Sequence, residues 1–108
     1  CNYCQTHHGS ALNHYWKDAD KVNQLKNDFS SLTLSAEDLA LCKYAKDVTL
    51  HPGQAESINV TKPLKNNGFS DSAILDATLV VAYFNFVNRM VLSLGVGLET
   101  DKGKGYKY

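Results

Sequence analysis

The chain has 108 residues, of which 44% are hydrophobic and 20% are charged, and its 11 basic and 11 acidic residues cancel. This length and composition predict one globular domain with a modest core, and argue against a disordered or fibrous chain. The chain has no net charge and so lacks the excess of basic residues that is typical of nucleic-acid-binding proteins. We therefore expect no nucleic-acid partner. The most apolar window, residues 73–94, contains Asp76, Asn85, Asn88 and Arg89. These residues are costly in lipid, so we expect no membrane span and no membrane partner.

The cysteine count is odd. Three cysteines allow at most one intramolecular disulfide, which argues against a secreted disulfide scaffold and favours a cytoplasmic location. The natural pair is Cys1 with Cys4, and Cys42 lies within a helical pattern where a small buried hydrophobe is expected. The chain lacks an initiator Met and a signal peptide, so we expect that processing or truncation produced its first residue.

The pattern of apolar residues predicts an all-α fold of four to five helices. The first helix covers about residues 4–15, and steps of three and four place Cys1, Cys4 and His8 along one of its faces. His7 lies one step round this helix, three residues after Cys4. The first eight residues therefore concentrate two thiols and two imidazoles at a helix start.

Start and stop signals predict two more helices. A short second helix can be capped by Asp18 or Asp20. Its apolar stripe consists of Val22, Leu25 and Phe29. A third helix covers about residues 36–48, with Ser35 as its N-cap, and residues 51–53 (His-Pro-Gly) end it.

Pro63 and Gly68 bound a fourth helix. A helix that begins at Thr61 places Pro63 in its first turn, where no hydrogen bond is lost, and Gly68 supplies a left-handed stop. We expect the folded domain to cover residues 1–100. Residues 101–108 are rich in Gly and Lys, which predicts a flexible tail.

A long apolar helix is predicted over about residues 72–94, with Ser70 or Asp71 as its cap and Gly95 at its end. Because it is hydrophobic around most of its circumference, it needs more cover than one small chain supplies. We therefore expect a homo-oligomer. The one polar stripe of this helix consists of Thr78, Asn85, Arg89 and Ser93. This stripe is interpreted either as a hydrogen-bonded strip or as the lining of an active-site cavity.

The chemistry expected at the first helix is that of a redox dithiol. A thiol attacks only as thiolate, and helix N-termini, cationic neighbours and Cys-x-x-Cys spacing lower a thiol pKa from ~8.5 to roughly 3.5–7.5. Cys4 is the predicted nucleophile, Cys1 its resolving partner, and His8 the group that accepts and returns the proton. The candidate supporting residues are His7, Tyr3, Asn85 and Arg89.

Two other chemistries use the same spacing. Cys1, Cys4 and His8 could be three ligands of a zinc ion, but the remaining ligand candidates have no familiar zinc spacing. Those candidates are His7, His14, His51 and Cys42. A thioredoxin-like dithiol would need alternating strands and helices, and no strand pattern is found. We therefore expect no metal.

A family resemblance agrees with the dithiol hypothesis. Residues 1–12 (Cys-Asn-Tyr-Cys-Gln-Thr-His-His-Gly-Ser-Ala-Leu) resemble the Cys-x-x-Cys-x-x-x-His motif of the alkylhydroperoxidase AhpD-like proteins, in the carboxymuconolactone decarboxylase superfamily. Residues 64–71, 82–89 and 94–96 resemble the branch of peroxidase-related proteins. The likeness runs over about residues 1–99, which is nearly the whole chain.

The resemblance implies an all-α antioxidant enzyme that forms trimers or hexamers. It implies a thiol-dependent peroxidase or disulfide reductase that reduces hydroperoxides without metal or haem and is restored by an external dithiol. Cys4 would be the peroxidatic residue, Cys1 would close the redox-active disulfide, and His8 would belong to a proton relay. The relay of the family also uses a glutamate on a helix before the first cysteine, so an N-terminal part is expected before Cys1.

Two other functions stay open. A decarboxylase of carboxymuconolactone type would act on a small lactone acid, and it would not need two thiols. A non-catalytic helical oligomerisation module would keep its cysteines for structure or for zinc.

Overall fold

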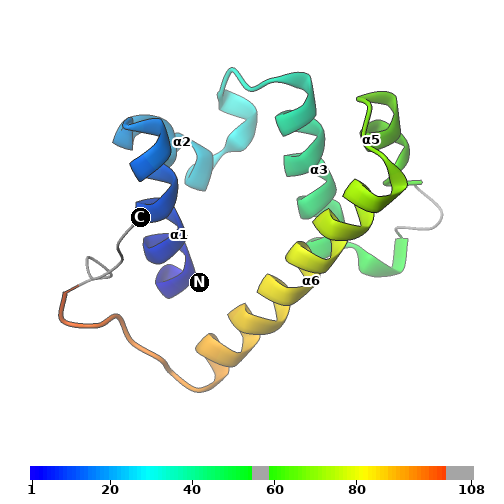
Figure 1. Ribbon diagram of the computed structural model, residues 1–108. Helices are drawn as coiled ribbons and strands as arrows, with labels where there is room; N and C mark the ends of the chain where they lie inside the picture. The colour runs from blue at the N-terminus through cyan, green and yellow to red at the C-terminus, as the bar shows by residue number, and fades with distance from the viewer. Residues whose placement is uncertain (55–58, 102–108) are drawn as a thin grey trace. The chain divides into compact units, whose positions relative to one another are not determined.

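The computed structural model describes residues 1–54 and 59–101 of the chain. This described part is all-α and contains no strand, which confirms the predicted fold class. Its elements (Figure 1) are α1 (Asn2–Trp16), α2 (Ala19–Asn27), η1 (Phe29–Ser31), α3 (Ala36–Leu50), η2 (Pro52–Gln54), α5 (Lys62–Asn66) and α6 (Asp71–Ser93), where η denotes a 3-10 helix. Apart from its first residue, the predicted tail lies outside the described residues.

Three of the helices begin at the caps that the sequence predicts. The side chains of Asp18, Ser35 and Ser70 accept hydrogen bonds from the backbone N–H three residues later, at 2.9, 3.0 and 3.1 Å. Each bond satisfies one of the amides that a helix start leaves without a partner. Where two caps were considered, Asp18 is used rather than Asp20, and Ser70 rather than Asp71.

The predicted stops also lie where the helices end. Gly68 and Gly95 follow α5 and α6 with φ of 84° and 64°, a conformation that side chains with a Cβ rarely adopt. Thr61 is the N-cap of α5, and Pro63 lies in its first turn. The long apolar helix is confirmed and begins one residue earlier than predicted.

The prediction for the second helix is wrong at its end. Phe29 was expected on the apolar stripe of α2, but this helix ends at Asn27, and Phe29 begins η1. The cause is Asp28, whose backbone is extended with φ of −156°. Its carboxylate accepts hydrogen bonds from the backbone N–H and the hydroxyl of Ser30, at 2.9 and 2.6 Å. An Asp side chain that binds the next turn in this way competes with helix continuation.

The contacts divide the chain into two units, and the first consists of Cys1–Leu32 and Val87–Tyr108. In this unit α1 and α2 pack against each other as a helical hairpin (Figure 1). Val22 is buried on α2, and His7 is buried on α1. The Nζ atom of Lys21 lies 4.4 Å from the centre of the Trp16 ring, a cation–π contact that joins the two ends of the turn.

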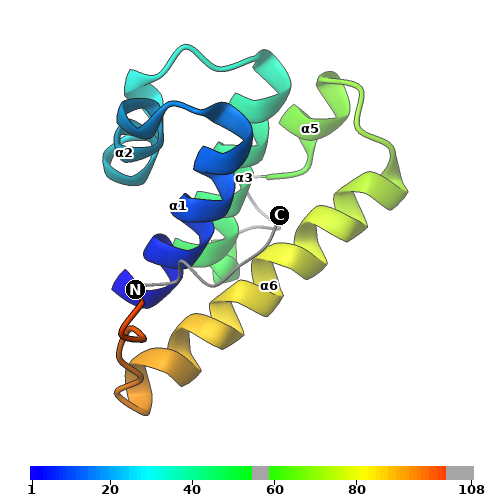
Figure 2. The ribbon, with the colours of Figure 1, turned by 60° about the vertical axis from the view of Figure 1, so that its left-hand side comes forward.

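The second unit, Thr33–Phe86, contains the main apolar core. Ala40 and Tyr44 of α3 pack with Leu64 of α5 and Ile74 of α6 (Figure 2), and Leu64 is fully buried. The hydroxyl of Thr78 donates to the Ile74 carbonyl oxygen at 2.6 Å. Its oxygen therefore accepts from the Tyr44 hydroxyl, also at 2.6 Å, so the polar end of the buried Tyr44 ring is satisfied.

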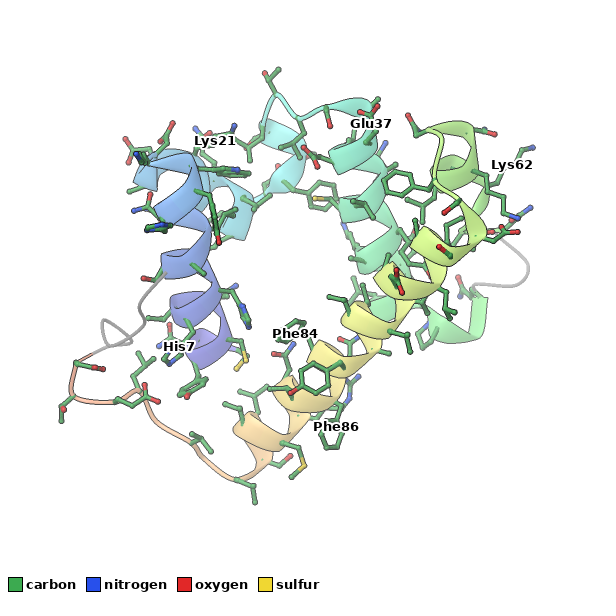
Figure 3. All side chains as sticks on the ribbon, viewed as in Figure 1. His7, Lys21, Glu37, Lys62, Phe84 and Phe86 are labelled. Carbon is green, nitrogen blue, oxygen red and sulfur yellow. The ribbon has the colours of Figure 1, made fainter. Side chains whose placement is uncertain are left out.

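Helix α6 exposes most of its apolar surface. Ile74 is its buried residue, and its large exposed hydrophobic residues are Leu75, Leu79, Val80, Tyr83, Phe86, Met90 and Leu92. Figure 3 shows Phe84 and Phe86 projecting to different sides of the helix. In the described part of the chain, α6 alone has the length and mean hydropathy that a membrane span requires. This is weak support for a span, since long apolar helices of other proteins have the same properties.

Candidate functional site

The two N-terminal thiols lie together at the start of α1. Cys1 is the N-cap of this helix, and its Sγ atom accepts a hydrogen bond from the Cys4 backbone N–H at 3.5 Å. The Sγ atoms of Cys1 and Cys4 are 2.8 Å apart, and both residues are free, partly buried thiols. The capping geometry therefore holds the pair in contact, with the positive end of the helix dipole beside the sulfur atoms.

A carboxylate from the end of the described chain lies against the same helix. Glu99 accepts a hydrogen bond from the Tyr3 hydroxyl through Oε1 at 2.7 Å, and its Oε2 atom lies 3.0 Å from Nε2 of His7. The rings of Tyr3 and His7 are 4.3 Å apart, centre to centre. Figure 3 shows His7 on the side of α1 that faces the segment after α6. Tyr3, His7 and Glu99 form one cluster, which we call the acid cluster.

The acid cluster has a defined charge. The hydrogen bond from Tyr3, followed by backbone hydrogen bonding and the neighbouring His7, lowers the pKa of Glu99 below its ordinary value of 4.5. Glu99 is therefore a carboxylate at neutral pH, and a carboxylate only accepts hydrogen bonds. The His7 side chain is 8% exposed, whereas that of Glu99 is 50% exposed, so the cluster joins a buried ring to a solvated charge.

The two histidines differ in their surroundings. His8 is exposed on α1, four residues after Cys4, as the predicted stripe requires. His7 is the buried histidine, and it is the one that contacts the carboxylate. At 100° per residue, Cys1, Cys4 and His8 share one face of α1, and Tyr3 and His7 share the neighbouring face.

The predicted polar stripe of α6 makes hydrogen bonds in the second unit. The side-chain amide of Asn85 donates to the Thr49 hydroxyl at 3.0 Å, and Thr78 binds Tyr44. These contacts favour a hydrogen-bonded strip at both positions over a cavity lining. Arg89 lies on α6 one turn later, within the first unit.

The residues considered as zinc ligands are not gathered at one place in the described part of the chain. Among residues 1–54 and 59–101, no three His, Cys, Asp or Glu side chains are placed to hold a metal ion together. The third cysteine, Cys42, lies on α3 in the second unit. Burial, with a smaller contribution from Asp38, raises the pKa of the Cys42 thiol, which is typical of an unreactive cysteine.

Glu99 is the candidate residue that sequence reasoning did not assign. Its contacts to Tyr3 and His7 join residues 96 and 92 positions apart in the sequence. The spacing of residues within one helix cannot predict a contact between residues so far apart. The one available signal was the scarcity of glutamates, since Glu37, Glu56 and Glu99 are the only three in the sequence.

No protein-family model matches the chain, and no curated protein is significantly similar to it.

Proposed function

We propose that this protein is a thiol-dependent peroxidase that uses Cys1 and Cys4 as a redox dithiol. The observation that carries the proposal is the 2.8 Å contact between the two Sγ atoms at the start of α1. A dithiol in contact can close a disulfide with little rearrangement of its backbone. The helix start also favours negative charge on sulfur, and the thiolate is the reactive form.

The proposed cycle balances without a metal or a haem. The Cys4 thiolate attacks the terminal oxygen of a hydroperoxide, the O–O bond breaks, and the leaving alkoxide takes a proton to become an alcohol. Cys4 is then a sulfenic acid. The Cys1 thiol attacks this sulfur and releases water, which forms the Cys1–Cys4 disulfide. An external dithiol supplies two electrons and two protons, becomes a disulfide itself, and restores both thiols.

The resemblance of residues 1–12 and 82–89 to the AhpD-like peroxidases supports the same function. A decarboxylase would leave the adjacent thiols without a role. A zinc-dependent module would need a third and a fourth ligand near the pair. A cytoplasmic location is consistent with free thiols that an external reductant must regenerate.

We also propose that the protein associates with further copies of itself through α6. Leu75, Leu79, Phe86 and Met90 follow one another at steps of four, seven and four, which places them on one face, here called the α6 stripe. Each of these residues is 45–60% exposed. An apolar face of this size is typical of an interaction surface. A trimer or hexamer is the state that the family resemblance implies.

The peroxidase proposal is tested by mass spectrometry. The reduced protein is treated with one equivalent of tert-butyl hydroperoxide, alkylated with iodoacetamide and digested. We expect a peptide that carries a Cys1–Cys4 disulfide and an alkylated Cys42. Recovery of alkylated Cys1 and Cys4 in full would refute the mechanism.

Three variants separate the roles of the thiols. Cys4→Ser should abolish peroxide consumption, and Cys1→Ser should accumulate a sulfenic acid that dimedone traps. Cys42→Ser is the matched control and should consume peroxide like the unchanged protein. His8→Ala should slow turnover by ~10²- to 10⁴-fold if His8 transfers the proton.

A further inference from the structure

We infer that the pocket between α3 and α5 binds an acidic amino acid, whose two carboxylates and one ammonium match two lysines and one aspartate on the rim of the pocket. The rim residues are Lys43 and Asp47 of α3 and Lys62 of α5. The pocket lies within the second unit, so the inference goes beyond the chemistry proposed for the dithiol.

The pocket has an apolar floor that belongs to the core of this unit. Its volume is about 350 Å³, which is typical of the smaller sites that bind small molecules. Ala40 and Tyr44 of α3 line it, and each is 5% exposed. The Tyr44 hydroxyl is bonded to Thr78, so this tyrosine offers a ligand its ring and not its hydroxyl. Leu64 is fully buried in the same core and anchors α5 beside α3 (Figure 1), so packing fixes both walls of the pocket.

The charges on the rim select the charges of the ligand. Lys43 and Asp47 are one turn apart on α3, and Lys62 begins α5 on the other wall. Within residues 1–54 and 59–101, none of these three side chains is in an ion pair. A plain dicarboxylate would bring negative charge against the aspartate, and a plain cation would face two lysines. A ligand with two carboxylates and one ammonium gives every charged group of the rim an opposite charge.

Two asparagines of the lining are already oriented by hydrogen bonds within the chain. The Oδ1 atom of Asn59 accepts from the Thr61 hydroxyl at 3.3 Å, which leaves its Nδ2 hydrogens for a ligand. The Nδ2 atom of Asn67 donates to the Pro63 carbonyl oxygen at 2.7 Å, which leaves Oδ1 as an acceptor. One amide therefore offers donors to a carboxylate, and the other offers an acceptor to an ammonium. The neutral lining favours the same ligand as the charged rim.

The inference is tested by NMR titration of the full chain with L-glutamate at pH 7 and constant ionic strength. The backbone amide signals of Asp47, Asn59 and Lys62 should shift and saturate. We expect a Kd of roughly 0.1–10 mM, as for a ligand of about ten non-hydrogen atoms. Glutarate lacks only the ammonium and L-norvaline lacks only the second carboxylate. Each should bind about two- to fivefold more weakly, since one exposed ion pair is lost.

Three variants assign the charges to their partners. Lys62→Gln should weaken L-glutamate by about two- to fivefold. Asp47→Asn should weaken L-glutamate by a similar factor but should bind glutarate at least as tightly as the unchanged protein does, because glutarate has no ammonium. Lys46→Gln is the matched control, since it removes an exposed charge from α3 outside the lining of the pocket, and its Kd should not change.

Several outcomes would overturn the inference. They are the absence of saturable shifts, shifts confined to residues outside the pocket, and equal binding of L-glutamate and glutarate. Equal weakening in Lys46→Gln and Lys62→Gln would also overturn it, because the effect would then be one of overall charge. Because none of these measurements involves peroxide, they test the pocket independently of the proposed peroxidase activity.

Discussion

Self-association through the α6 stripe should be sensitive to a charge at Leu79. Its side chain is 60% exposed, and it is the second of the four residues of the α6 stripe. Complete burial of a leucine contributes roughly 1.5–3 kcal/mol, so covering the exposed 60% contributes about 1–2 kcal/mol per copy. In a symmetric contact each variant copy loses this amount, and the pair loses about 2–4 kcal/mol. This corresponds to a Kd that rises roughly 30- to 700-fold, before the cost of burying the new charge is added.

The test compares Leu79→Glu with a matched control on the same helix. Leu92→Glu introduces the same charge at a leucine that is 63% exposed. It lies 13 positions later, which places it about 220° round the helix from Leu79. Sedimentation velocity over a concentration series should show association of the unchanged protein and of Leu92→Glu, and a largely monomeric Leu79→Glu.

Two results would refute this reasoning. The unchanged protein could sediment as a monomer at every concentration, or both glutamate variants could associate equally. A monomer that co-sediments with phosphatidylcholine vesicles, and loses this property in Leu79→Glu, would instead assign the exposed face of α6 to a lipid surface.

Other perturbations probe the core, a cap and two titrating groups. Leu64→Ala should cost about 2–5 kcal/mol in the free energy of urea unfolding, because the side chain is fully buried; a loss below ~1 kcal/mol would contradict the packing described here. Ser35→Ala should cost about 0.5–2 kcal/mol in the same assay, since it removes the cap of α3. Iodoacetamide should modify Cys42 more slowly in the folded chain than in urea at pH 7, because burial raises its pKa; equal rates would argue against that burial. The folded state lowers the pKa of Glu99, so the unfolded state binds more protons as the pH falls below about 4.5. The acid cluster therefore contributes to the stability of the folded state above this pH, and the contribution is lost below it. A titration of the NMR shift of the Glu99 carboxyl should report the lowered pKa.

The helices could be predicted from the sequence because their ends depend on neighbouring residues. Ser35, Ser70 and Gly95 act on backbone groups within one turn of themselves, so their effects can be recognised without knowledge of the fold. The same locality explains the one error in the second helix. Asp28 could have been recognised as a residue that binds the following turn, but the apolar spacing to Phe29 was given more weight.

In the candidate site, too, the local contacts could be predicted from the sequence and the long-range contacts could not. The contact between Cys1 and Cys4 lies within one helical turn and was predicted from their spacing. The acid cluster depends on the path of the chain after α6, which no periodicity in the first 16 residues specifies. His7 was therefore treated as a neighbour of the site, and its burial against Tyr3 and Glu99 appeared only in the structure.

The contact between Tyr3 and Glu99 also bears on the order in which the chain folds. It closes a loop of 96 residues, and closure entropy rises with loop length, so this contact should form after the helices it joins. The Glu99 side chain is half exposed, so opening this contact costs little free energy. The first turn of α1 should accordingly exchange its amide hydrogens by opening of this loop alone, faster than the core around Leu64. The start of α1 and the segment after α6 should therefore gain and lose order as one unit.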